Sequence, residues 1–267
     1  MTNKIPENHR EQAKLNITIR RYIDFPKMVS LIEMGALWFS RLGALEDQFE
    51  GTLPQKTRLT MIEDSRKWFS TFPNPDHQKQ LLDSTDRNVA DGRCVLVVNC
   101  WSLGENESLY MWKEYARNEF GIAIRSTIGR LRRSLYGDPN HLWIGVVEYI
   151  DFKTNDMTIY HGSQAMKRAF LKRDRKFEDE CELRVCAMND ITMSRFNPDG
   201  SAASEIQKKG PGGFDPFRPG LYIKVDLDKL IESIYVAPGS PGWFLELLKR
   251  ITKRYGLNAP ILFSELD

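Results

Sequence analysis

The chain has 267 residues, enough to bury a sizeable core as one large domain or two small ones. Its 38 lysines and arginines nearly balance its 36 aspartates and glutamates, and the net charge of +2 excludes a uniformly basic or acidic protein without excluding a local patch. The four cysteines form no CxxC pair and the four histidines are scattered, so a structural zinc site is not expected.

Targeting and membrane signals are weak along the chain. Residues 1–12 are polar and lack the apolar region of a signal peptide. The longest apolar runs, such as 95–98, are far too short to span a bilayer. Because the chain is also too large and too rich in lysine to need disulfides, we expect a soluble cytoplasmic protein with reduced cysteines and no membrane partner.

The first part of the chain predicts a strand, a helix and a strand in turn. Residues 16–25 read as a strand, 26–35 as a short helix with proline in its first turn and glycine at its end, and 36–42 as a second strand. A polar, helix-like insertion follows at 52–92, and we expect a buried strand at 93–103.

The middle of the chain continues with mixed elements. A helix is predicted at 107–118, and strands are predicted at 120–127 and 142–152. Residues 163–179 predict a basic helix, which leads into a strand that starts at residue 177.

The last part of the chain combines a long loop with a regular end. Residues 194–220 carry clustered proline and glycine without a usable period, and loops of this length are often functional. Strands are predicted at 220–227, 231–238 and 259–266, with a helix at 240–256 whose serine, proline and glycine lie where a helix begins and ends.

This order of elements favours one α+β domain over residues 1–267, because the helices cluster at a few points instead of alternating regularly with strands. No GxGxxG follows a strand, no GxxxxGK[ST] is present and no GxSxG occurs. A Rossmann dinucleotide site, a P-loop and a hydrolase nucleophile elbow are therefore not supported.

The octapeptide FEDECELR has a period of two. This period places Glu180, Glu182 and Arg184 on one face of a strand and Cys181 and Leu183 on the other. On burial statistics alone the charged face is a solvated surface with a cross-strand ion pair. The alternative is a working site.

Several stretches resemble one bacterial family known only as a domain of unknown function, number twenty-nine seventy-one. The resemblance runs from about residue 20 to the C-terminus, in the order that the family shows. The stretches are RY at 21–22, GALWFSRLGALEDQFEG at 35–51, CWSLGENESLYMWKEYARNEFGIAI at 100–124, FEDECELR at 177–184, and IYVAPGSPGWF at 234–244 with a closing FSEL.

The layout of these motifs also resembles that of the ADP-ribosyltransferases. Arg21 and Tyr22 match the first motif position, Ser40 the second, and Glu180 and Glu182 the late Glu-x-Glu. The resemblance implies mixed and antiparallel sheets that form a central cleft flanked by helices, with NAD as substrate. It also implies a macromolecular acceptor, protein or nucleic acid, and a role as a bacterial toxin or anti-phage defence effector that an antitoxin or chaperone could silence.

The chemistry that this resemblance implies is cleavage of the nicotinamide glycosidic bond through an oxocarbenium-like ribose. A fixed carboxylate favours such a cation in the transition state, a role that suits Glu182, while Glu180 could orient the incoming nucleophile. No metal is expected.

The resemblance also implies residues that would bind NAD. Arg21 would hold the pyrophosphate, the Tyr22 ring would cover nicotinamide or adenine, and Ser40 would donate to a ribose. Arg184 would keep Glu182 ionised. Arg20 points to the opposite strand face from its neighbour, and either arginine could be a surface charge.

Three further residues are candidates for NAD binding. Glu50 lies near the second strand and either contacts substrate or belongs to a polar turn. Trp112 and Tyr115 lie at i, i+3 on a predicted helix, a spacing that is most often core packing and could otherwise contact the cofactor.

The basic segment before FEDECELR is a candidate surface for an RNA or DNA acceptor. Lys167, Arg168, Lys172 and Arg173 either form a solvated helix face or supply sequence-independent phosphate contacts.

Two alternatives to NAD chemistry stay open at the level of the sequence. Asp47, Glu50, Glu180 and Glu182 would form a metal-dependent nuclease or phosphodiesterase if they converged on one ion. The chain could also be a non-catalytic module that holds nucleic acid or a partner protein.

Overall fold

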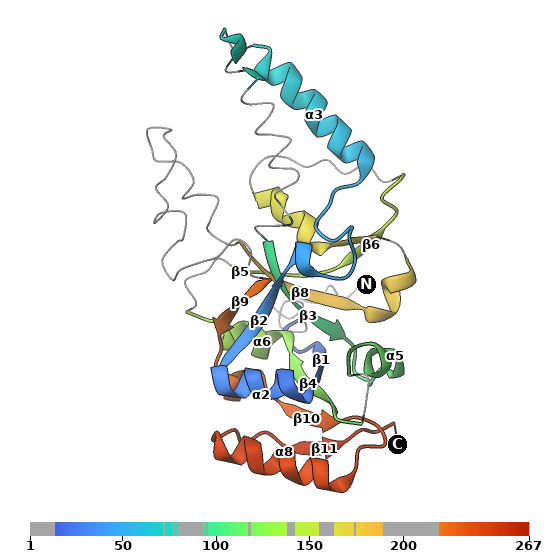
Figure 1. Ribbon diagram of the computed structural model, residues 1–267, viewed down its shortest axis with the longest axis vertical. Helices are drawn as coiled ribbons and strands as arrows, with labels where there is room; N and C mark the ends of the chain where they lie inside the picture. Colours follow the sequence, from blue (N-terminus) through green and yellow to red (C-terminus); the bar gives the residue numbers. More distant parts are fainter. Residues whose placement is uncertain are drawn as a thin grey trace, which may run out of the picture.

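The computed structural model describes residues 14–71, 73–76, 78–79, 93, 96–116, 119–137, 142–154, 163–173, 175–188 and 219–266 (Figure 1). The centre of the molecule is a nine-stranded mixed sheet, mostly antiparallel, with helices around it. The predicted α+β class is therefore confirmed. None of the helices in the described ranges is long and apolar enough to cross a membrane.

The large sheet has the order β11-β10-β4-β1-β3-β2-β9, and β8 pairs with both β3 and β5. A second, two-stranded parallel sheet joins β6 (Glu148–Ile150) and β7 (Leu171–Arg173). The strands of the large sheet are β1 (Thr18–Asp24), β2 (Ala36–Arg41), β3 (Leu96–Leu103), β4 (Gly121–Thr127), β5 (Leu142–Val146), β8 (Glu182–Met188), β9 (Gly220–Lys224), β10 (Ser233–Val236) and β11 (Ile261–Phe263).

The helices lie at both ends of the molecule and beside the sheet. Figure 1 shows α3 extending away from the sheet at one end and α8 beside β10 and β11 at the other. The α-helices are α2 (Phe25–Met34), α3 (Gln55–Phe69), α5 (Leu109–Met111), α6 (Ile128–Ser134), α7 (Leu227–Leu230) and α8 (Gly242–Arg254). The short 3-10 and π segments are η1 (Leu42–Ala44), η2 (Trp112–Ala116), η3 (Ser163–Phe170) and η4 (Arg175–Glu180).

The sheet forks at β3. Strand β8 pairs with β3 from residue 96 to residue 102 and so occupies one edge. On the other edge, β1 pairs near the end of β3, Arg20 opposite Ser102, while β2 pairs near its start, Ser40 opposite Val98. Strands β1 and β2 therefore diverge from the two ends of one edge.

Helix α2 forms where the sequence predicts it because its ends are capped. The Asp24 carboxylate accepts the backbone N–H of Lys27 at 2.8 Å, and Pro26 lies in the first turn. Gly35 closes the helix in the left-handed region with φ +51°, and its N–H donates to the carbonyl of Ile32. The capped helix sets the angle between β1 and β2.

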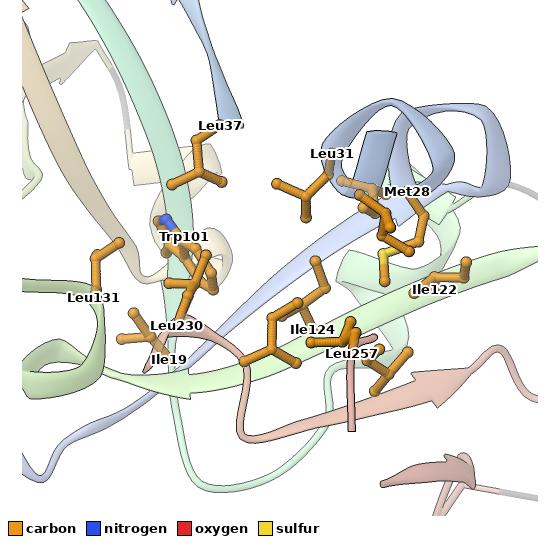
Figure 2. Close-up of a cluster of buried hydrophobic side chains, with 14 of the residues drawn as sticks. Ile19, Met28, Leu31, Leu37, Trp101, Ile122, Ile124, Leu131, Leu230 and Leu257 are labelled. Atoms are coloured by element: carbon orange, nitrogen blue, oxygen red, sulfur yellow. The ribbon is translucent and has the colours of Figure 1, made fainter. Parts of the chain in front are cut away.

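The main core lies between the sheet and the helices that cover it. Figure 2 shows residues of this core from β1, β3 and β4 meeting side chains of α2, among them Met28, Leu31 and the fully buried Trp101. Phe244 and Leu248 of α8 join the same cluster. Each such side chain contributes about 1.5–3 kcal/mol of burial free energy, which makes the sheet a rigid support.

The basic segment 163–179 is not the single helix that the sequence predicts. It divides into η3, the strand β7 and η4, and β7 pairs with β6, Lys172 opposite Tyr149. The carbonyl of Ala169 accepts a hydrogen bond from Arg184, and Lys172 turns inward to carboxylates. These long-range partners outweigh local helix preference.

Other boundaries also differ from the predictions. The predicted strand 142–152 is interrupted at Val147, and the predicted strand 177–184 starts at Glu182. The predicted loop 194–220 lies outside the described residues except for its last two, as does most of 72–92 in the predicted insertion.

Candidate active site

A cleft of about 1360 Å³ opens at the fork between β1 and β2. It exceeds the roughly 300–1,000 Å³ that is typical of small-molecule pockets, so it has room for a ligand larger than a single nucleoside. Its lining includes most of the side chains on which the sequence hypothesis depends, namely Arg21, Tyr22, Ser40, Glu50, Tyr115, Lys172, Arg173, Glu180, Glu182 and Arg184.

One side of the cleft is formed by β8 together with Glu50, Lys172 and Glu180, and we call it the β8 wall. Arg184 lies at its centre and is only 1% exposed. Its Nε and Nη2 donate to the two oxygens of Glu182 at 2.8 and 2.9 Å, and Nη1 and Nη2 donate to the two oxygens of Glu50 at 2.8 Å each. Nη1 also donates to the carbonyl of Ala169 at 2.9 Å. All five N–H groups of the guanidinium are thus used.

This geometry agrees with the expected role of Arg184 beside Glu182, and it leaves Arg184 in the NAD site without a direct contact to NAD. No donor is left on Arg184 for a ligand, since two carboxylates and a carbonyl take every N–H. The same contacts show that Glu50 is a buried partner of Arg184 with both oxygens engaged. Arg184 therefore fixes Glu50 and Glu182 in position.

Glu182 is held as an anion. Burial alone raises the pKa of Glu182, but the charge and hydrogen bonds of Arg184, helped by Lys172, outweigh burial and bring this pKa below its ordinary value. The Cys100 thiol also donates to Glu182, and burial together with the Glu182 charge raises the pKa of that thiol well above its usual range.

Glu180 has the opposite shift. Its oxygens accept from Lys172 Nζ at 2.5 Å and from the Tyr115 hydroxyl at 3.0 Å. Burial raises the pKa of Glu180, and Lys172 only partly opposes this effect. Two neighbouring carboxylates whose environments move their pKa values apart are typical of an acid–base pair with separate roles.

A strained residue joins the two glutamates. Cys181 has φ +42°, in the left-handed region that non-glycine residues rarely adopt and that costs about 1–2 kcal/mol. Ser102 donates to the carbonyl of Glu180 at 2.9 Å, and the N–H of Glu182 donates to the Tyr149 hydroxyl at 3.0 Å, which holds the strained segment. Such strain concentrates at functional sites.

Arg20 and Arg21 have separate functions. Arg20 donates to the carbonyls of Gly104, Glu105 and Asn106 and so holds that loop. Arg21 lines the cleft, and its buried Nη1 has no hydrogen-bond partner among the described residues.

Burial lowers the pKa of Arg21 to about 10, so the group still carries a proton at neutral pH. A buried guanidinium nitrogen without a hydrogen-bond partner is costly, and an anionic ligand would satisfy it.

The aromatic candidates differ in their placement. The Tyr22 ring is 6% exposed, packs edge-on against Trp112 with ring centroids 5.0 Å apart, and accepts the N–H of Ser108. Trp112 is absent from the cleft lining and donates its indole N–H to Glu107. Tyr22 and Trp112 belong to one buried cluster. Tyr22 still lines the cleft, so its contact with NAD stays a prediction, whereas Trp112 lies behind the lining, where direct contact with NAD is not expected.

Ser40 and Tyr115 do line the cleft. Ser40 accepts the indole N–H of Trp38 at 3.1 Å, while the Tyr115 hydroxyl is bound to Glu180. Burial raises the pKa of Tyr115 far above its ordinary value, and the charge of Glu180 raises it further, so the hydroxyl keeps its proton and donates.

The four basic residues predicted to meet an RNA or DNA acceptor do not share a solvated face. Lys167 is exposed, whereas Arg168 and Lys172 are buried. The Arg173 guanidinium lies 3.6 Å from the centroid of the Phe49 ring at the cleft. The predicted helix face is missing because β7 interrupts the segment, which is not one continuous helix.

Three of the four carboxylates of the rival metal hypothesis meet around cations, while the fourth, Asp47, accepts the backbone N–H of Phe49. Arg184 binds Glu50 and Glu182, and Lys172 binds Glu180. Within the described part of the chain, no group of three histidine, cysteine, aspartate or glutamate side chains has the arrangement of a metal site. The geometry favours a network of ion pairs.

Cys100 and Lys172 both contact glutamates of the cleft, and the sequence did not assign either residue to the NAD site. Cys100 lies opposite Arg184 in the register of β3 and β8, and Lys172 was assigned to the acceptor surface. The alternation of Cys100 and Ser102 in the predicted strand 93–103 was the available signal for the first, while no local signal marks an inward-facing lysine.

Comparison with known proteins adds no relative. The chain matches no protein-family model, no curated protein and no solved structure.

Proposed function

We propose that the protein is an ADP-ribosyltransferase that cleaves the nicotinamide glycosidic bond of NAD and transfers ADP-ribose to a macromolecule. One observation carries the proposal: a single cleft combines Arg21, whose buried Nη1 has no hydrogen-bond partner among the described residues, with two carboxylates, Glu180 and Glu182, whose pKa values are shifted in opposite directions. The forked sheet and the order of the sequence motifs support the same fold family.

Arg21 would bind the pyrophosphate. A planar guanidinium with a free donor matches phosphate oxygens, and the buried Nη1 gains the partner it lacks when they arrive. Ser40, on the diverging strand β2, is in the same cleft and would contact a ribose.

Glu182 would stabilise the ribose cation. Three carboxylates of this wall, Glu50, Glu180 and Glu182, face two cations, Arg184 and Lys172, which leaves one negative charge uncompensated. Because the carboxylate of Glu182 is already fixed by Arg184, it needs no reorganisation as positive charge develops on the ribose.

Glu180 would act as the base. Its raised pKa suits proton transfer near neutral pH better than the lowered pKa of Glu182 does. In the transfer, the bond from C1′ of the ribose to the nicotinamide nitrogen breaks with its electron pair on nitrogen, the acceptor atom bonds to C1′, and the acceptor proton moves to Glu180.

The test is release of nicotinamide from NAD by the purified protein. Glu180→Gln keeps the side chain's shape and removes the base, so we expect transfer to fall by about 10²–10⁴-fold with the circular dichroism spectrum unchanged. Equal transfer by Glu180→Gln and the parent, or no nicotinamide release by the parent with cell lysate present, would remove the proposal.

The acceptor and setting follow from a second experiment. NAD labelled in its adenylate part, incubated with the protein and a bacterial lysate, should give a macromolecular product that either protease or nuclease digests. The resemblance of the motif layout to the ADP-ribosyltransferases favours a cytoplasmic toxin or defence effector, and the digestion decides between protein and nucleic acid as its target.

A further inference from the structure

Lys172 lies within reach of three carboxylates. Its Nζ is 2.5 Å from Glu180, 3.7 Å from Glu50 and 3.7 Å from Glu182, and it lies 4.5 Å from the centroid of the Phe177 ring. Among the residues that the structure describes, Lys172 is the one cation in an ion pair with Glu180. A lysine this deeply buried has a specific partner.

Arg184 cannot replace Lys172 at this position. Its five N–H groups are used by Glu50, Glu182 and the carbonyl of Ala169, so none reaches Glu180. The two cations of this wall therefore have different partners.

We propose that Lys172 is a positioning residue that keeps Glu180 ionised and aimed into the cleft, while Arg184 holds Glu182. This inference rests on the proposed function of the cleft, in which Glu180 accepts the proton of the incoming nucleophile. It gives Lys172 a role in the NAD site in place of contact with a nucleic-acid acceptor.

One close cation favours the negative charge of Glu180, and several other features of its surroundings disfavour that charge. Lys172 and the Tyr115 hydroxyl bind the carboxylate directly, and burial disfavours its charge. Without Lys172, burial and the Glu182 charge both act to keep a proton on Glu180. The charged or titratable groups on the elements around Lys172 and Glu180 include Glu50, Tyr110, Glu114, Tyr115, Tyr149, Arg173, Asp179, Glu182 and Arg184.

The first test is a carboxyl titration followed by NMR in the protein without substrate. The Glu180 resonance is identified by its loss in Glu180→Gln, and its midpoint is compared between the parent and Lys172→Met. We expect the midpoint to rise by about one pH unit or more in Lys172→Met, since a close opposite charge shifts a carboxyl by about 1–3 units. Lys172→Arg should keep the midpoint within about half a unit of the parent because it keeps the charge.

Two further variants control the titration. Lys167→Met removes an exposed lysine from the preceding segment and should leave the midpoint unchanged. The double variant Lys172→Met with Glu50→Gln keeps the net charge of these side chains at its value in the parent, and it still lacks the ammonium at Glu180. An unchanged Glu180 midpoint in either variant that lacks Lys172 overturns the inference.

The second test is the pH profile of nicotinamide release. Lys172→Met should move the acidic limb to higher pH and lower kcat at pH 7 about tenfold, with KM for NAD nearly unchanged because Arg21 is intact. Loss of kcat with an unmoved limb contradicts the role given to Lys172. If the parent releases no nicotinamide, the proposed function fails, whereas the titration still decides whether Lys172 controls Glu180.

Discussion

The two walls of the cleft differ in how their arginines are satisfied. On β8, all the N–H groups of Arg184 donate to Glu50, Glu182 and a carbonyl, so Arg184 has every hydrogen bond it can make without a ligand. On β1, Arg21 reaches the cleft with a buried donor that has no partner among the described residues. The β8 side therefore stabilises the fold and orients its glutamates. The buried donor on the β1 side lowers the stability of the free protein, and a bound anion would remove this destabilisation.

Replacing Arg184 should have the largest effect on the fold. Arg184→Met leaves Glu50 and Glu182 buried with most of their partners gone, and removing one member of a buried ion pair costs about 3–5 kcal/mol. Urea unfolding at pH 7 measures this loss. A cost below about 1 kcal/mol would show that the β8 wall is not the stabilising one.

Replacing Arg21, unlike replacing Arg184, should not lower the stability of the fold. Arg21→Met removes a buried donor without a partner, a feature that costs about 1–3 kcal/mol, so the free energy of unfolding should stay equal or rise. The affinity for NAD should fall about tenfold or more, because a hydrogen bond to a charged group is lost.

Calorimetric titration with NAD and urea unfolding of the same sample measure both quantities for Arg21→Met. Arg20→Met is the matched control, since Arg20 holds the 104–106 loop and its loss should destabilise the protein. If Arg21→Met destabilised the protein as much as Arg20→Met, the contrast between the walls would be lost.

The two glutamates should respond differently to pH. The folded-state pKa of Glu180 is raised, so its ionised form is disfavoured by folding, and Glu180→Gln should be more stable than the parent at pH 7. The folded-state pKa of Glu182 is lowered, so its contribution is present at pH 7 and is lost as the pH falls below the ordinary glutamate value.

Urea unfolding at pH 7 and pH 4 separates these two effects. Glu182→Gln should be less stable than the parent at pH 7, and this deficit should shrink at pH 4. Glu180→Gln should be more stable than the parent at pH 7, and this advantage should also shrink at pH 4. Relative to the parent, the stabilities of the two variants therefore change in opposite directions as the pH falls. Variants that respond to pH in the same direction would contradict the separate roles assigned to the glutamates.

Local signals predicted the first elements of the fold well. Asp24, Pro26 and Gly35 mark the ends of α2, and the alternation of apolar residues gives β1, β2 and β3. These features depend on neighbours in sequence, which explains why the sequence was sufficient. It also brought Arg21, Glu180 and Glu182 forward as candidates, and the structure places all three in one cleft.

Long-range contacts explain what the sequence did not predict. Nothing near Lys172 indicates that it turns inward, because its carboxylates come from three other segments. The sequence also placed Glu180 and Glu182 on one strand face by alternation, whereas Glu180 ends η4 and Glu182 begins β8. The bend at Cys181 brings the two carboxylates to the same ammonium, and no sequence pattern marks a cysteine for positive φ.

The smallest expected effect comes from relieving that bend. Cys181→Gly removes the left-handed penalty of about 1–2 kcal/mol but adds the backbone entropy of glycine, about 0.5–1 kcal/mol, so the net gain in unfolding free energy should be at most about 1.5 kcal/mol. Cys181→Ala keeps the penalty and should match the parent, since the side chain is exposed. If Cys181→Gly is no more stable than Cys181→Ala in urea, the bend stores no strain, and hydrogen bonds such as those of Ser102 and Tyr149 are sufficient to place the two glutamates.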